Sequence, residues 1–128
     1  MNWTGLVAAL SVFLGIWIGH VSVRKVESST AHLWLPASLA FVLGLGLEAW
    51  SLSTQNQTLS TALGIIGITV LWDALELFRQ EKRIKHGHAP ANADNPRHAR
   101  LLLEYPSATT INLLKREPTG GPISNREE

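Results

Sequence analysis

The first 78 residues consist of three long apolar runs separated by short polar connections. The runs cover residues 3–23, 33–53 and 59–78. A helix of about 20 residues is about 30 Å long, which matches the hydrocarbon core of a bilayer. The helical spacing of the third run continues to about residue 86, until Gly87 and Pro90 stop it. The pattern therefore predicts three membrane-spanning helices, the last of which has a polar extension.

The other interpretation of such a pattern is three core helices of a soluble protein. Those helices would be expected to show a polar stripe, and residues 3–23 have none. The residues before the first run carry no charge, whereas a cleaved signal peptide begins with a basic segment. We therefore expect an all-α integral membrane fold, with a three-span domain over residues 1–86 and an extended C-terminal tail over residues 87–128.

The distribution of charge divides the chain at Phe78. Only two basic residues, Arg24 and Lys25, precede it, whereas nine Lys and Arg and six Asp and Glu follow it. Arg24 and Lys25 lie in the first connection, and the second connection has no basic residue. Basic residues accumulate on the cytoplasmic side of membrane proteins. We therefore expect the N-terminus outside, and the helical extension and the tail in the cytoplasm.

Five polar residues lie at one level of the predicted spans, at the inner leaflet. With this orientation Asp73 and Glu76 come near the end of the third span, level with the end of the first. One interpretation is a proton-handling or quinone-headgroup site. The favoured interpretation is that these groups lie near the headgroups and hold helices together, with His20 close to Asp73 and Arg24 or Lys25 close to Glu76. The cluster consists of His20, Arg24, Lys25, Asp73 and Glu76.

Cofactor chemistry has little support in the sequence. His20 and His32 are weak candidates for haem ligands, because they lie at the cytoplasmic edge of the first two spans. The absence of cysteine excludes thiolate sites. The tail histidines His86, His88 and His98 lack the partners of a metal site and are interpreted as part of a solvated basic segment. No phosphate loop, catalytic set or nucleic-acid module is present. We expect no metal, no cofactor, no nucleic acid and no enzymatic activity.

Small residues recur at helical spacing in all three runs. Such residues allow membrane helices to approach closely. Three short spans cannot use all these faces on one another, so a face for another subunit is also expected. The predicted packing residues are Gly15, Gly19, Ala40, Gly44, Gly64 and Gly67.

The tail carries two apolar clusters separated by residues 106–110. Neither is long enough to fold alone, and apolar side chains left in water promote aggregation. A neighbouring protein subunit is favoured over the membrane surface, because the second cluster lies far from the last span and has few basic neighbours. The predicted partner-binding residues are Leu101, Leu102, Leu103, Tyr105, Ile111, Leu113 and Leu114.

Several segments resemble a family of small bacterial membrane proteins known as domain of unknown function 4491. The resemblance covers about residues 1–92. It rests on residues 1–6, His20, 71–72, 76–83 and the stop at 85–90. The chain departs from the family at Val21, where proline is usual, and by continuing well beyond the stop. The resemblance implies a bacterial inner-membrane protein and supplies no activity, substrate or cofactor.

Together these features favour a non-catalytic accessory or anchoring subunit of a larger inner-membrane complex. Its expected partners are the lipid bilayer and other protein subunits, contacted by the spans and the tail. The alternative is a small redox or proton-handling membrane protein that uses the polar cluster. A channel is disfavoured, because no span has a polar stripe along its length.

Overall fold

The computed structural model describes residues 3–113, and residues 1–2 and 114–128 lie outside this description. It contains four helices: α1 (Trp3–Ser29), α2 (Trp34–Ser53), α3 (Gln57–Lys85) and α4 (Pro96–Glu104). No strand occurs between residues 3 and 113. The predicted all-α fold is therefore confirmed.

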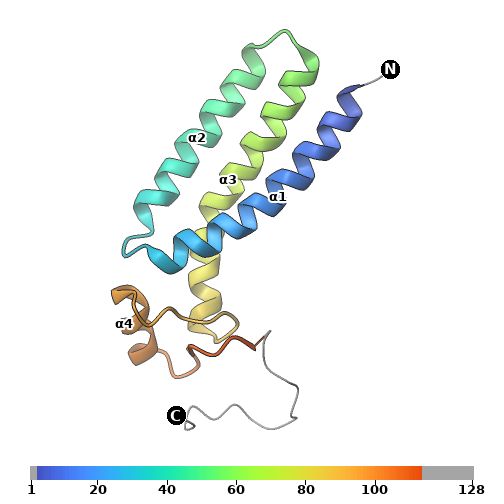
Figure 1. The fold of residues 1–128 in the computed structure, drawn as a ribbon. Coiled ribbons are helices and arrows are strands. Elements are labelled where there is room, and N and C mark those ends of the chain that lie inside the picture. Colours follow the sequence, from blue (N-terminus) through green and yellow to red (C-terminus); the bar gives the residue numbers. More distant parts are fainter. Residues whose placement is uncertain (1–2, 114–128) are drawn as a thin grey trace.

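The three long helices pack together in an arrangement that we call the layer: α3 lies between α2 and the first half of α1, and the second half of α1 crosses α3 toward the start of α2 (Figure 1). Helices α1 and α2 each pack along α3 and make little contact with one another. All three are long and apolar enough to cross a membrane. Each contains one of the predicted spans, and α1 continues six residues beyond Val23 to Ser29.

Small residues set the spacing within this layer. A Cβ atom on Gly44 of α2 would lie 2.6 Å from Leu71 Cγ and 3.0 Å from the Gly67 carbonyl oxygen of α3. On α1, a Cβ atom on Gly15 would lie 3.3 Å from Thr69 Oγ1. Five of the six predicted packing residues, all glycines, thus face another helix of the same chain, and Ala40 is half-buried.

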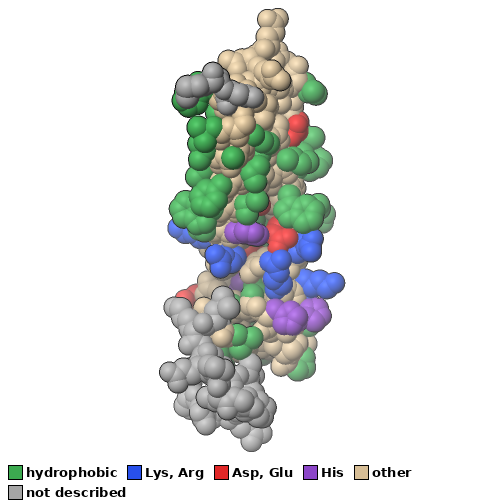
Figure 2. Space-filling view, turned by 90° about the vertical axis from the view of Figure 1, so that its right-hand side faces the viewer, with side chains coloured by type: hydrophobic (Ala, Val, Ile, Leu, Met, Phe, Trp, Pro, Cys, Tyr) green, Lys and Arg blue, Asp and Glu red, His purple; other side chains and the backbone are tan. Residues whose placement is uncertain are grey.

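The layer leaves large apolar side chains exposed along its helices. They include Phe13 and Trp17 of α1, Val42 of α2 and Leu75 of α3. Figure 2 shows hydrophobic side chains over the upper part of one face, with Lys, Arg and His side chains in a band below them. This exposed apolar surface is far larger than the apolar surface that a soluble protein exposes to water. Lipid tails cover it without cost, so the fold is that of a multi-pass membrane protein.

The chain continues past α3 and folds back against the ends of α1 and α3. Gly87 (φ 72°) adopts the left-handed conformation that ends α3. Asn95 caps α4 by accepting from the Arg97 N–H (2.9 Å), and Pro96 occupies the first helical turn. Leu101 is buried in a cluster with Ile84 and Ala91. The sequence analysis did not predict this helix within the tail.

Candidate functional site

The basic residues of the three long helices gather at one end of the layer, which we call the basic end. It carries Arg24 and Lys25 of α1 and Arg79, Lys82 and Arg83 of α3. Three arrangements of polar side chains lie here: a groove around Asp73, ion pairs of Glu76, and a junction between α1, α3 and α4.

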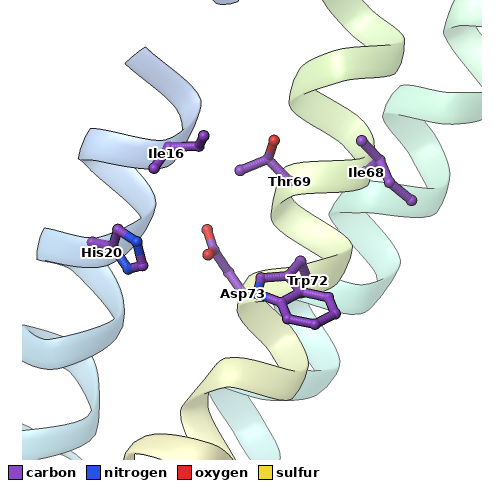
Figure 3. Close-up of a pocket in the computed structure, with 6 residues that line it drawn as sticks. All are labelled: Ile16, His20, Ile68, Thr69, Trp72 and Asp73. Carbon is purple, nitrogen blue, oxygen red and sulfur yellow. The ribbon is translucent and has the colours of Figure 1, made fainter. Parts of the chain in front are cut away.

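The first arrangement is an open groove of about 430 Å³ between α1 and α3. Figure 3 shows the Asp73 carboxylate and the His20 ring pointing into the space between these helices. Gly19 makes room for the carboxylate, because a Cβ atom there would lie 2.7 Å from Asp73 Oδ2. The groove thus brings together the predicted pair. Its lining consists of Ile16, His20, Ile68, Thr69, Trp72 and Asp73.

The second arrangement neutralises the buried carboxylate of Glu76. Its Oε1 lies 2.5 Å from Arg83 Nη2, and its Oε2 lies 3.4 Å from Arg79 Nε. Both partners belong to α3 itself, whereas the sequence analysis expected Arg24 or Lys25 of α1. Arg24 instead donates from Nε to the His20 carbonyl oxygen (3.2 Å). Arg79 and Arg83 lie three and seven residues after Glu76 on the same helix, so Glu76 is paired without a residue of α1.

The third arrangement is a buried junction, which we call the α1–α4 junction and define by Glu27, Glu81, Arg97 and His98. Glu27 is 1% exposed and His98 is fully buried. Glu27 Oε1 lies 2.7 Å from Arg97 Nη2 and 2.9 Å from His98 Nε2. Arg97 Nη1 also reaches Glu81 Oε2 of α3 at 2.5 Å. One guanidinium thus links three helices.

The tautomer of His98 follows from its partners. The Asn92 backbone N–H donates to His98 Nδ1 (2.8 Å), so Nδ1 is the ring atom without a hydrogen. The hydrogen of a neutral ring is then on Nε2, where it is donated to Glu27 Oε1. With His98 neutral, the junction contains two negative charges, on Glu27 and Glu81, and one positive charge, on Arg97. Lys85 supplies the second positive charge, because its Nζ lies 2.6 Å from Glu81 Oε1. The junction is therefore electrically neutral.

The same segment satisfies the last carbonyl groups of α1, which have no partner within their own helix. Asn95 Nδ2 donates to the carbonyl oxygens of Ser28 (2.9 Å) and Thr30 (3.0 Å). Asn92 Nδ2 donates to Ser28 (3.0 Å), and Arg97 Nη2 donates to the Glu27 carbonyl oxygen (2.6 Å). The positive charge of Arg97 also complements the negative end of the α1 dipole. Residues 92–97 thus act as a C-terminal cap supplied from outside the helix.

The sequence analysis did not assign a role to Glu27 or Arg97, and it placed His98 in a solvated basic segment. One local signal was available: Asn95-Pro96 before a leucine-rich run is typical of a helix start. It could have predicted α4. It could not have predicted the partner, because Glu27 and Arg97 are 70 residues apart in the chain.

The remaining candidates are dispersed. His32 is exposed in the connection between α1 and α2, and no described contact joins it to His20. Among residues 3–113 no three His, Cys, Asp or Glu side chains form a group that could hold a metal ion. Of the predicted tail residues, Leu101 is buried and Leu102 half-buried, while Leu103 is 88% exposed. Tyr105, Ile111 and Leu113 are exposed, and Leu114 lies outside the described residues.

The fold and its polar end define a small multi-pass membrane protein without a recognisable catalytic centre in the described part of the chain. The chain belongs to the family described as Domain of unknown function (DUF4491), whose model matches residues 2–95. The expected family membership is thereby confirmed. No curated protein and no solved structure matches the chain. The matched range ends at residue 95, so Arg97 and His98 lie beyond it.

Proposed function

We propose that the protein is a non-catalytic accessory or anchoring subunit of a larger complex in the bacterial inner membrane. The observation that carries this proposal is the pairing of the buried charges within the chain. Glu27, Glu76 and Arg97 each bind opposite charges of the same chain. Catalytic groups are usually held in an unbalanced environment, so this neutral arrangement favours a structural role.

The orientation is part of the proposal. The basic end carries six Lys and Arg side chains on α1 and α3, because Lys85 ends α3 there, and the connection between α2 and α3 carries none. By the positive-inside rule the basic end faces the cytoplasm and the N-terminus lies outside. A periplasmic reporter fused after Thr54 is expected to be active, and the same reporter fused after Pro90 inactive. Activity of a cytoplasmic reporter after Thr54 would contradict this orientation.

The exposed part of the folded tail is the expected contact with a protein partner. Leu103 projects from α4 with 88% of its surface exposed, and Tyr105, Ile111 and Leu113 follow on the same segment. Because Leu101 holds α4 against the helical layer, the exposed side chains are presented by an anchored segment. An anchored segment loses less conformational entropy on binding than a free tail does.

Co-purification tests the proposal with variants that leave the junction intact. Full-length tagged protein is isolated from its native membrane in mild detergent, and the bound proteins are quantified by mass spectrometry. Leu103→Glu is expected to deplete a specific partner several-fold, whereas Arg100→Gln, an exposed change on the same helix, retains it. Isolation of the chain without any stoichiometric partner would contradict the accessory role. Deleting the tail is a poorer test, because it also removes the Arg97 and His98 partners of Glu27 and so changes the end of α1.

A second candidate function rests on the groove. Among the described residues Asp73 makes no hydrogen bond or ion pair, and its carboxylate shares the groove with the His20 ring. An unbonded carboxylate beside an imidazole suits a proton-handling or quinone-headgroup site. An absorption spectrum and a quinone extraction of the purified protein test this alternative. A bound chromophore or quinone at one equivalent would favour it over the accessory role.

A further inference from the structure

A second hollow lies on α3 just beyond the apolar part of the helix, with a volume of about 470 Å³. We call it the basic hollow. Its α3 residues Lys82 and Arg83 lie three and four residues after Arg79, so all three lie close together on the helix surface. Leu75 and Trp72, both exposed, lie one and two turns before Arg79, toward the apolar part. The basic hollow is lined by Arg79, Lys82, Arg83, His86 and His88.

The cations of the basic hollow are held in place by groups beneath them. Arg83 donates from Nη1 to Gln80 Oε1 (2.8 Å), and its Nη2 contacts Glu76 Oε1. Gln80 and Glu76 are buried, so this guanidinium is fixed from below. The Arg79 guanidinium lies over the Trp72 ring, 5.3 Å from its centroid, and uses Nε toward Glu76. Two guanidiniums are thus oriented before any ligand arrives.

Positive charge remains after these internal contacts. Arg79 and Arg83 share the single carboxylate of Glu76, and Lys82 adds a third cation, so the basic hollow keeps two positive charges. The Lys82 ammonium and the terminal nitrogens of Arg79 have no hydrogen-bond or ion-pair partner among residues 3–113. His86 donates from Nδ1 to the Lys82 carbonyl oxygen (2.8 Å), and its ring stacks on His88 with centroids 6.0 Å apart. The unpaired N–H donors of Lys82 and Arg79 are suited to binding an anion.

The position of the basic hollow identifies the kind of anion. It begins where the apolar surface of α3 ends, so a ligand that fills it can also cover Trp72 and Leu75. We propose that the basic hollow binds the phosphodiester of an anionic phospholipid, whose acyl chains lie along Trp72 and Leu75. Phosphate oxygens accept from the terminal nitrogens of Arg79 and from Lys82, and the tryptophan lies at the depth where indole rings are favoured.

This inference rests on the membrane-spanning fold and not on the accessory role. It also differs from the general attraction of basic residues to a membrane, because it assigns the lipid to one face of α3. Lys25 provides the comparison: it carries the same charge at the same end of the layer, but it belongs to α1 and lies outside the basic hollow.

Lipid retention measured by native mass spectrometry tests the proposal. The full-length chain is exchanged into detergent containing equal amounts of phosphatidylglycerol and phosphatidylcholine. The wild type is expected to retain one phosphatidylglycerol. Arg79→Gln and Lys82→Gln each remove an exposed cation and are expected to weaken retention about fivefold, which corresponds to about 1 kcal/mol per cation. Lys25→Gln is expected to leave retention unchanged.

Three results would overturn the proposal. One is equal retention of phosphatidylglycerol and phosphatidylcholine. Another is an equal loss in Lys25→Gln and Arg79→Gln, which would indicate a diffuse charge effect. The third is displacement of the lipid by inorganic phosphate at the same concentration, which would assign the basic hollow to a soluble anion. Circular dichroism of each variant checks that the helices are intact.

Discussion

The layer of α1, α2 and α3 and the α1–α4 junction are held together by different forces. The layer is almost free of ion pairs and depends on close contact between small residues, such as Gly44 against Leu71. The α1–α4 junction depends on charged groups withdrawn from solvent, with Glu27 1% exposed. In the layer a mutation acts through shape, whereas in the junction it acts through uncompensated charge.

This difference predicts which part of the molecule is more sensitive to a single change. Many small contacts share the stability of the layer, because each glycine position contributes a fraction of the packing. Three ion-pair contacts join the four residues of the α1–α4 junction, so loss of Glu27 alone removes two of them, those to Arg97 Nη2 and to His98. We therefore expect a single change in the α1–α4 junction to destabilise the protein more than a single change in the layer.

Glu27→Ala is expected to have the largest effect. It leaves Arg97 and His98 buried without their shared acceptor, and removing one partner of a buried pair costs about 3–5 kcal/mol. Hydrogen exchange of residues 96–104 is expected to rise to the rate of an exposed segment, while the amides of residues 60–75 stay protected. Glu104→Ala, an exposed acidic change on α4, is the control. Unchanged protection of α4 in Glu27→Ala would show that the ion pairs do not hold it.

Leu101→Ala is expected to weaken the junction through its apolar contact. Removing a buried leucine side chain costs about 2–3 kcal/mol at a site of this size, because a cavity remains beside Ile84 and Ala91. Leu103→Ala, two residues away and almost fully exposed, is expected to change stability by less than about 0.5 kcal/mol. The rate of limited proteolysis at sites after residue 87 compares the two variants. Equal sensitivity of the two variants would contradict the docked position of α4.

Gly44→Ala is expected to disturb the layer by a smaller amount. The added Cβ atom would meet Leu71 Cγ at 2.6 Å, and overpacking of this kind costs about 1–3 kcal/mol. Gly46→Ala meets no atom within 4 Å and is expected to be neutral. Thermal unfolding in detergent, followed by circular dichroism, measures both. A similar midpoint for the two variants would place α2 at a different rotation on α3.

Asp73→Asn is expected to have the smallest effect on the fold. Asp73 makes no hydrogen bond among the described residues, and asparagine has nearly the same volume. Its free energy of unfolding is expected to match that of the wild type within about 0.5 kcal/mol, as for a change outside the core. Assembly with partners is expected to persist. Loss of proton or electron transfer with assembly intact would instead favour the redox alternative.

Most features of the layer could be predicted from the sequence. Each apolar run is about 20 residues long, so the three spans could be predicted from local pattern alone. The glycine positions could be predicted for the same reason, although the sequence did not show that they would all serve contacts within one chain. The placement of His20 near Asp73 could be inferred from depth, because both groups lie toward the ends of the first and third spans, which run in the same direction.

The α1–α4 junction had no such signal. Glu27 occupies a connection rich in charge and serine, where an exposed carboxylate is the ordinary expectation. Its partners follow 70 and 71 residues later, within a segment whose composition is typical of a solvated tail. Periodicity reports which face of a helix is buried, and it carries no information on which distant side chain supplies an opposite charge. Glu76 shows the same limit, since nearby arginines of α3 replaced the expected partner from α1.

The most direct test of the account is a cross-link between the end of α1 and the segment before α4. The chain contains no cysteine, so Ser28→Cys with Asn92→Cys introduces the only thiol pair. Asn92 Nδ2 lies 3.0 Å from the Ser28 carbonyl oxygen, and a short thiol-specific cross-linker in native membranes is expected to join the two positions. Ser28→Cys with Leu103→Cys is the control, and it is expected to react far less. Efficient cross-linking of the first pair alone is the result that the account predicts. Equal cross-linking of both pairs, or of neither while both thiols accept a maleimide label, would contradict the α1–α4 junction.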